Sequence, residues 1–328
     1  MRTLTHFHLT FAALIITCAI VPTARAEDLP ADPVASAFSK SLLADFDPSY
    51  NPALAQTAGP PTAESQPETP SEFTSQKDLQ ITVTGGVWFP RLGGTSTLKN
   101  AAGEEPTIDF ETDFFLRDRQ YIPLIEVSIL KNQTWQIDLT GFWTTADNDG
   151  EFQGTHSTYG SLVFDHNDPY SISVDINSFA VQLSYWGFKP LSLSHDSEAN
   201  LWFSPLLAMR YLNVTETVRS FGPAGGVENQ DNDWFAIMLG PQMHFSWECH
   251  DKLPIFQSID LDAYGAAGPA FGDDFGAAWQ IKACITARFP NNFEVSFGYR
   301  LLELNVHADD YTFDAGLQGL FLSASWRF

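Results

Sequence analysis

The sequence predicts an all-β protein: a closed antiparallel transmembrane β-barrel of about ten strands, preceded by a signal peptide and a disordered linker. Apolar and polar residues alternate with a period of two from residue 79 to the last residue. The alternating runs have about 12 to 17 residues, whereas strands of soluble proteins usually have about 5 to 6. The aromatic fraction of 14% and the hydrophobic fraction of 44% exclude wholesale disorder.

Residues 1–26 are predicted to be a secretory signal peptide. Arg2 precedes an apolar run from Leu9 to Val21, and Ala24-Arg25-Ala26 fits the small-x-small cleavage rule. The alternative, a membrane-anchoring helix, needs ~20 apolar residues and the run is shorter. The stretch Ile15-Ile16-Thr17-Cys18 resembles a lipoprotein box only faintly, because threonine before the cysteine is atypical.

Residues 27–77 are predicted to be a flexible periplasmic segment. They contain eight proline, eight alanine and seven serine residues, a composition typical of extended linkers. Val34, Phe38, Leu42 and Phe46 recur every four residues and would share one face of a short helix. A helix of this length is marginal alone in water. The segment is therefore either a helix that forms on docking or an unstructured stretch.

Residues 78–328 are predicted to form the barrel. In one run Trp135, Ile137 and Leu139 face one side, while Gln136 and Asp138 face the other. A membrane strand needs about 9 to 11 residues, so the runs are long enough to cross a bilayer. Closed bacterial barrels have an even number of strands. Ten runs are found, at roughly 79–91, 119–131, 134–145, 171–187, 199–214, 232–248, 256–270, 277–289, 293–306 and 312–328.

The connections between these runs predict the orientation of the barrel. Those after the second and eighth runs, 132–133 and 290–292, are tight, whereas those after the first, third and fifth span about 92–118, 146–170 and 215–231. Long extracellular loops and short periplasmic turns are typical of outer-membrane barrels. The sequence therefore predicts a protein of the outer membrane of a Gram-negative bacterium.

The nine tryptophans provide an independent indication, because each lies near a predicted strand end, where bilayer interfaces favour amphipathic rings. The alternation places five of them toward lipid: Trp135, Trp143, Trp247, Trp279 and Trp326. The other four are expected inside the barrel: Trp88, Trp186, Trp202 and Trp234.

The last ten residues resemble the C-terminal signal of outer-membrane β-barrels, with Leu322, Ala324 and Trp326 facing outward and Phe328 at the end. The resemblance implies that the barrel-assembly machinery reads this strand. Further upstream, the segments 85–90, 209–211 and 298–300 are similar to strands of small OmpA-like barrels. The resemblance covers residues 79–328, implies the fold, and carries no catalytic motif.

The alternation places a set of charged side chains inside the barrel. The predicted interior charge network comprises Glu126, Asp138, Arg210, Glu248, Asp262, Lys282, Glu294 and Arg300. A barrel of ten strands is narrow, so these side chains are expected to fill most of the lumen. They either form a structural network of ion pairs, since desolvated charges need partners, or they gate a narrow polar path for small solutes.

The chain is strongly acidic, with 17 Lys+Arg against 40 Asp+Glu and a net charge of −23. A nucleic-acid partner is excluded, because binding phosphate requires a basic face. Clustered acids in the predicted loops either bind hard cations such as Ca²⁺ or form a solvated, repulsive face. These acids are Glu104, Glu105, Asp109, Glu111, Asp113, Asp147, Asp149, Glu151, Asp165, Asp168, Asp273, Asp274, Asp309 and Asp310.

No catalytic residue, metal site or cofactor is assigned. His156, His166 and His307 lie in three different predicted loops, so a hydrolase site at the rim would require them to meet acids in space. Cys249 and Cys284 form either one disulfide or two separate thiols, and neither belongs to a CxxC motif.

The predicted function is a structural or surface-binding role for a barrel with a largely plugged lumen, in contact with outer-membrane lipid and lipopolysaccharide. A narrow channel for small solutes and a rim-site hydrolase are the alternatives, because the fold alone does not determine function.

Overall fold

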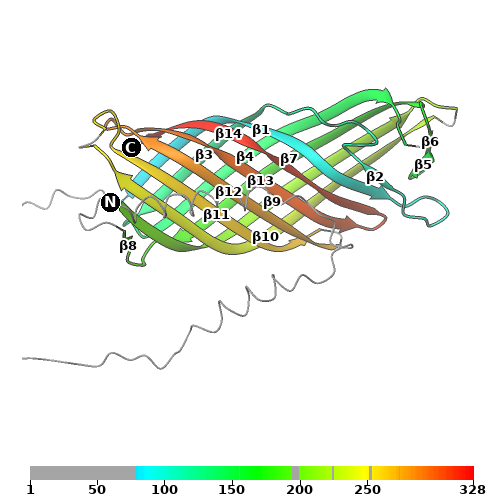
Figure 1. The fold of residues 1–328 in the computed structure, drawn as a ribbon. Coiled ribbons are helices and arrows are strands. Elements are labelled where there is room, and N and C mark those ends of the chain that lie inside the picture. The colour runs from blue at the N-terminus through cyan, green and yellow to red at the C-terminus, as the bar shows by residue number, and fades with distance from the viewer. Residues whose placement is uncertain (1–78, 155, 194–198, 224, 251–252, 273) are drawn as a thin grey trace, which may run out of the picture. The chain divides into compact units, whose positions relative to one another are not determined.

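The computed structural model describes residues 79–154, 156–193, 199–223, 225–250, 253–272 and 274–328. In this part of the chain all regular structure is β, and ten long strands curve into a barrel (Figure 1). The barrel strands are β1 (Leu79–Leu98), β3 (Ile122–Lys131), β4 (Trp135–Glu151), β7 (Pro169–Tyr185), β9 (Ala199–Ser220), β10 (Gly226–Glu248), β11 (Ser258–Phe271), β12 (Phe275–Arg288), β13 (Phe293–Ala308) and β14 (Tyr311–Arg327).

Each of these strands pairs antiparallel with the next one along the chain, and β14 pairs with β1. The pairing of β1 with β14 runs from Thr82↔Arg327 to Leu98↔Tyr311, so the sheet is closed over the full length of β14. The predicted closed antiparallel barrel of ten strands is thereby confirmed. No helix able to cross a bilayer is found among the residues that the structure describes.

Four short strands complete the fold. β2 (Thr107–Asp109) pairs with β1, and β8 (Leu191–Ser192) pairs with β9. β5 (His156–Tyr159) and β6 (Leu162–Asp165) form a separate hairpin within the connection from β4 to β7.

The two ends of the barrel differ in their connections. At one end, here called the turn end, β1 begins and β14 ends, and the connections are 132–134, 186–198, 249–257 and 289–292. At the other end, here called the loop end, the connections are 99–121, 152–168, 221–225, 272–274 and 309–310.

An apolar band surrounds the outside of the barrel on the side of the turn end. On β10 the outward residues from Phe235 to Trp247 are all apolar, and the Leu239 side chain is 66% exposed. The outward assignment of the five predicted tryptophans holds, while Trp88 and Trp234 are buried and Trp186 and Trp202 line the lumen. The band is therefore the lipid-facing surface of a transmembrane barrel.

A row of aromatic residues ends this band over five neighbouring strands. Phe179, Tyr211, Phe235, Phe271 and Phe275 are successive register partners from β7 to β12, and all five are exposed. Aromatic side chains are favoured where hydrocarbon meets water. The row marks the level at which these strands leave the hydrocarbon.

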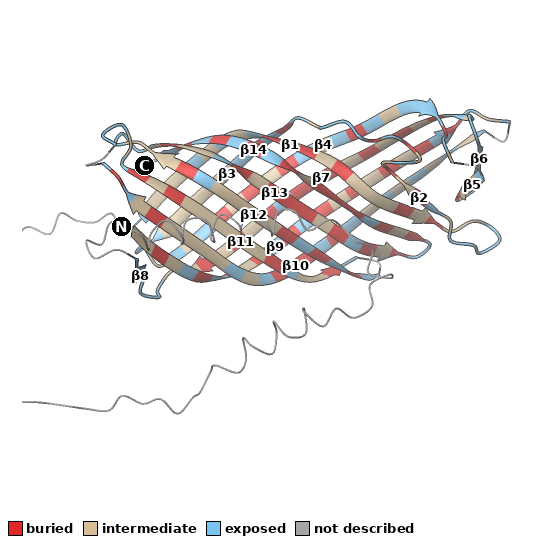
Figure 2. Cartoon of the chain, in the orientation of Figure 1, coloured by how far each residue is buried: buried red, intermediate tan, exposed pale blue. Residues whose placement is uncertain are grey.

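Beyond the aromatic row the two faces of the strands exchange character. On β9 the outward residues Thr215 and Thr217 are polar, whereas the inward residues Val214 and Val218 are buried. More buried and less buried residues continue to alternate along the extended parts of β9 and β10 (Figure 2).

The predicted loops at 92–118, 146–170 and 215–231 were therefore too long, because the strands continue into them. β1 runs on to Leu98, β4 to Glu151 and β9 to Ser220, and only residues 221–225 connect β9 to β10. Polar residues on the outward face resembled a loop in the sequence, although the chain remains extended.

We expect Leu239→Arg to lower the free energy of unfolding from lipid vesicles by about 2 to 4 kcal/mol, the cost of a lipid-facing arginine near the bilayer midplane. The matched control is Asn229→Arg, because Asn229 also faces outward on β10 but lies beyond the aromatic row. It is expected to change stability by less than about 0.5 kcal/mol, as is usual for surface positions. Equal losses in urea-gradient refolding would place the membrane boundary elsewhere.

The predicted signal peptide 1–26 and linker 27–77 lie outside the described residues. The same holds for the predicted helix of Val34, Phe38, Leu42 and Phe46. These assignments remain predictions.

Candidate functional site in the barrel interior

The interior of the barrel is arranged in three layers along its length. A polar cavity of about 460 Å³ occupies the layer nearest the turn end. A layer of buried arginines follows, and an apolar core fills the layer nearest the loop end.

An ion pair and a histidine–carboxylate contact line the polar cavity. Lys282 Nζ lies 3.1 Å from Glu126 Oε2, and His244 Nδ1 lies 2.7 Å from Asp262 Oδ1. Asp138 accepts a hydrogen bond of 2.8 Å from Gln136 Nε2. Carboxylates inside the cavity are thus matched with cations or donors, as is required of groups shielded from water.

A second cluster of ion pairs lies closer to the turn end and centres on Arg288. Its Nη2 lies 2.8 Å from Asp260 Oδ2, and its Nε donates to Glu294 Oε1 at 2.9 Å. Arg327, the last residue of β14, also pairs with Glu294. The cluster joins β11, β12, β13 and β14 across the inner surface of the barrel.

The second layer is formed by two buried arginines that reach across the lumen. Arg210 extends from β9 and donates to Ser178 Oγ at 2.6 Å and to Gln280 Oε1, on β12, at 2.8 Å. The guanidinium of Arg300 lies 5.4 Å from the ring centre of Trp88 and 5.9 Å from that of Phe142. Within the described chain no carboxylate lies in ion-pair distance of either guanidinium.

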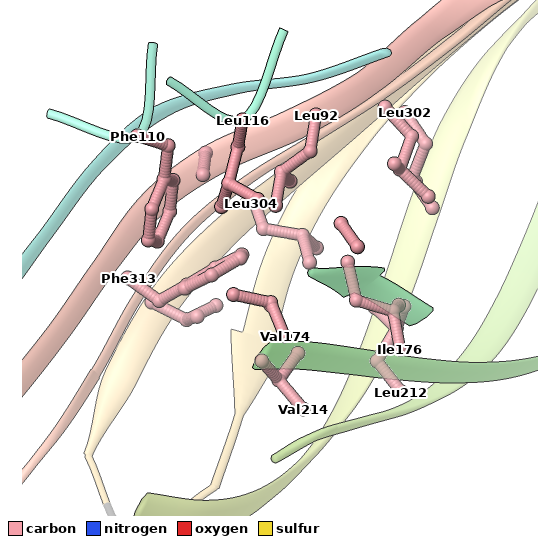
Figure 3. Close-up of a cluster of buried hydrophobic side chains, with 14 of the residues drawn as sticks. Leu92, Phe110, Leu116, Val174, Ile176, Leu212, Val214, Leu302, Leu304 and Phe313 are labelled. Atoms are coloured by element: carbon pink, nitrogen blue, oxygen red, sulfur yellow. The ribbon is translucent and has the colours of Figure 1, made fainter. Parts of the chain in front are cut away.

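The third layer is a core of buried apolar side chains from strands all around the barrel. Figure 3 shows the centre of this cluster, in which Leu92, Val174, Leu212, Leu304 and Phe313 approach one another inside the lumen. Their exposure to solvent does not exceed 2%. The lumen is filled at this level.

Side chains from the two long loops complete this core. Phe114, from the connection 99–121, is fully buried, and its ring centre lies 4.7 Å from that of Tyr170 and 5.7 Å from that of Phe164. Tyr170 Oη donates to the Phe114 carbonyl at 2.6 Å. Phe164 belongs to the β5–β6 hairpin, so both loops fold inward and pack in the mouth of the barrel.

One carboxylate, that of Glu216, is buried in the apolar core beyond the aromatic row. It accepts a hydrogen bond of 2.8 Å from Tyr311 Oη, and burial raises the pKa of Glu216 above its ordinary value. Burial likewise raises the pKa of Tyr311. Glu216 was not among the predicted interior charges, because this part of β9 was predicted to be a loop.

The structure distributes the predicted interior charges over several places. Glu126 and Lys282 meet each other, Asp262 meets His244, and Glu294 joins the Arg288 cluster. Arg210 and Arg300 form the second layer, and Asp138 lines the cavity. Contrary to the prediction, Glu248 is not inside the barrel, because it is the last residue of β10 and is exposed at the turn end. Asp260 and Arg327 also take part in ion pairs, although neither was predicted to belong to the network. Asp260 lies two residues from Asp262 on β11.

Two of the three loop histidines have cross-strand partners. His156 Nδ1 lies 2.7 Å from Asp165 Oδ1, its register partner in the β5–β6 hairpin. His307 Nδ1 lies 3.0 Å from Thr312 Oγ1, its register partner on β14. Both contacts are cross-strand pairs.

Several loop acids cap backbone groups. Asp109 Oδ1 accepts from the backbone nitrogens of Glu111 and Thr112 at 2.8 Å each, and Asp168 Oδ2 accepts from that of Asp165 at 2.8 Å. Three further predicted loop acids, Asp147, Asp149 and Glu151, lie on β4 itself, and Asp273 lies outside the described residues. Among the described residues no group of three or more His, Cys, Asp or Glu side chains is arranged to hold a metal ion.

The cysteines and the terminal strand can also be located. Cys249 and Cys284 are not joined by a disulfide bond. Leu322, Ala324 and Trp326 are exposed on the outside of β14, and Phe328 is exposed after its end. The four residues of the predicted assembly signal therefore present one outward surface.

No family model and no curated protein matches this chain. Among solved structures, the attachment invasion locus protein Ail of Yersinia pestis is 11% identical, with 76% of this chain and 98% of that chain covered and a TM-score of 0.27. The translocator domain of the autotransporter NalP from Neisseria meningitidis is 10% identical, with 76% and 87% covered and a TM-score of 0.38. The toluene transporter TodX of Pseudomonas putida is 9% identical, with 76% and 90% covered and a TM-score of 0.24.

Proposed function

We propose that this chain is a non-conducting outer-membrane protein of a Gram-negative bacterium, related to the small OmpA-like barrels, with a structural or surface-binding role. The observation that carries the proposal is the apolar core. Side chains such as Leu92 and Phe313 fill the lumen, and Phe114 packs over them from the first long loop. Ions do not cross such a layer, because leaving water for an apolar interior is costly.

The proposed orientation follows from the connections. Short turns face the periplasm in bacterial barrels and long loops face the outside, so the polar cavity opens toward the periplasm and the acidic loop end faces the medium. Outer-membrane lipid and lipopolysaccharide surround the apolar band. The barrel-assembly machinery would read the outward surface of Leu322, Ala324, Trp326 and Phe328 during insertion.

Two layers of the barrel interior argue against the alternative of a channel for small solutes. A solute entering the polar cavity would first reach Arg210 and Arg300 and then the apolar core. The charges expected to gate a path lie mainly on the periplasmic side of the arginine layer, so they do not form a continuous polar route. His156 does meet Asp165, but this exposed contact is a cross-strand pair of the β5–β6 hairpin and does not by itself support a rim-site hydrolase.

The test is a measurement of conductance with the purified full-length protein in planar bilayers. We expect no stable channel currents, while an open porin reconstituted in parallel as a control gives steady ones. The preparation must first fractionate with the outer membrane and migrate faster on gels before boiling than after it, as a closed barrel does. Large, steady currents from the unmodified protein would contradict the proposal and favour the channel.

A further inference from the structure

β10 has an edge without a partner at the loop end of the barrel. β9 pairs with β10 from Gly226↔Ser220 onward, but β11 reaches only as far as Phe271, the partner of Phe235. In the described part of the chain, residues 226–234 are therefore paired on one side only. Every second residue of an unpaired edge directs its backbone N–H and C=O groups away from the sheet.

This edge borders a notch in the barrel wall. β11 and β12 end early and are joined by residues 272–274, whereas β13 continues to Ala308. Across the gap between β10 and β13, Trp234 Nε1 donates to the His307 carbonyl at 3.3 Å. The buried Trp234 thus forms the floor of the notch and holds its two sides together.

A cavity of about 350 Å³ lies in the notch, lined among others by Lys99, Glu228, Gln230, Asn232 and Asp310. The side-chain nitrogen of Asn232 is buried and has no hydrogen-bond partner. An amide nitrogen in this position can donate to a carbonyl oxygen. The cavity therefore places the Asn232 side-chain amide, a hydrogen-bond donor, beside the backbone N–H and C=O groups of the β10 edge.

The notch is acidic on both sides of the edge. Glu228, Asp309 and Asp310 lie at the cavity, and Asp231 and Asp233 lie on the outward face of β10. The nearby cation Lys99 lies 3.4 Å from Asp310 and 3.3 Å from Glu105, so its charge is already shared. A ligand at this edge would meet an excess of negative charge from both of its faces.

We propose that the β10 edge of residues 226–234 binds an extended basic peptide segment, which adds to the sheet as a further strand. Main-chain hydrogen bonds supply affinity in this mode of recognition, and alternate side chains supply specificity. Lysine or arginine side chains on one face of the peptide would reach Glu228 and Asp310, and those on the other face Asp231 and Asp233. The inference rests on the proposed function, which places the loop end outside the cell.

The test uses the full-length protein in detergent micelles and fluorescent peptides of nine residues, the length of Gly226–Trp234. One peptide alternates lysine and threonine. A second has the same sequence and charge but N-methylated alternate backbone nitrogens, which removes its strand-forming donors. By fluorescence anisotropy at constant salt, we expect the unmodified peptide to bind at least tenfold more tightly than the N-methylated one.

Variants identify the site. Glu228→Gln with Asp310→Asn is expected to weaken binding of the unmodified peptide at least fivefold. The matched control, Asp147→Asn with Asp149→Asn, removes two outward acids from β4, which β7 and β9 separate from β10. It is expected to change the Kd less than twofold.

Equal binding of both peptides, equal weakening in both double variants, or no binding would each overturn the inference. A dimer that cross-links through this edge and excludes the peptide would also overturn it, because the edge would then serve a second copy of the chain. Absence of peptide binding in a protein that is located in the outer membrane and does not conduct would leave the proposed function standing.

Discussion

Replacing Phe114 with alanine is expected to lower the free energy of unfolding by about 3 to 5 kcal/mol, the usual cost of deleting a buried phenylalanine ring. The ring is fully buried and touches Phe152, Phe164 and Tyr170, which come from the second long loop and from β7. Its loss would leave a cavity between the two loops that close the barrel. Guanidinium unfolding in micelles, followed by tryptophan fluorescence, measures the change.

The neighbouring residue provides the matched control. Phe115 is 39% exposed, and its ring contacts the guanidinium of Arg117 on the surface. Phe115→Ala is expected to cost less than about 1 kcal/mol, because it removes only an exposed cation–π contact. Similar losses in the two variants would mean that the loops do not pack into the lumen as described.

Arg288→Leu is expected to lower stability by about 3 to 5 kcal/mol, the cost of removing one partner from a buried ion pair. The Asp260 side chain is only 1% exposed, and Arg288 is its ion-pair partner at 2.8 Å. Glu294 retains Arg327 in the variant, so the uncompensated charge falls chiefly on Asp260. The same unfolding assay measures the loss.

A second substitution tests this cause. Adding Asp260→Asn to Arg288→Leu removes the uncompensated carboxylate and should recover about half of the lost stability or more. Lys131→Leu serves as the control for removing a cation at the turn end, because Lys131 is exposed at the end of β3. If the double variant is as unstable as Arg288→Leu alone, lost packing of the arginine stem is responsible instead.

The membrane-spanning part of the barrel could be predicted from the sequence, because lipid imposes a single rule on every outward position. Runs such as Phe235 to Trp247 follow that rule without exception, and they gave the strand number and the facing of the tryptophans. The positions of Trp88 and Trp234 inside the barrel followed from the same alternation.

The parts of the strands beyond the aromatic row could not be recognised from the sequence, because there the outward residues are polar and the inward residues are apolar. On β10 the outward Asn229, Asp231 and Asp233 are polar, and the corresponding stretch of β9 carries threonines. A pattern of apolar residues facing lipid ends at the aromatic row, so the rest of each strand was predicted to be a loop. The alternation is still present there, with apolar residues such as Val214 and Val218 facing inward. It predicts a strand only if the outer face is assumed to contact water instead of lipid.

The interior charges illustrate a different limit. Period-two alternation predicts that Glu126 and Lys282 face the interior, but it contains no information on which strands face one another across a lumen. The two residues are 156 positions apart, and their contact depends on the closure of the whole sheet. The apolar plug was not predicted either, because Phe114 and Phe164 lie in loops whose inward folding has no periodic signal.

The exchange of faces at the aromatic row also fixes how deeply the barrel sits in the bilayer. A strand rises about 3.3 Å per residue, and tilt reduces this to about 2.5 Å along the membrane normal. Sinking by about 5 Å would bring the outward Asp233 into hydrocarbon, and rising by the same distance would expose Phe235 and its neighbours to water. Both displacements are opposed, so the exchange of faces holds the acidic rim at a defined height relative to the lipid surface.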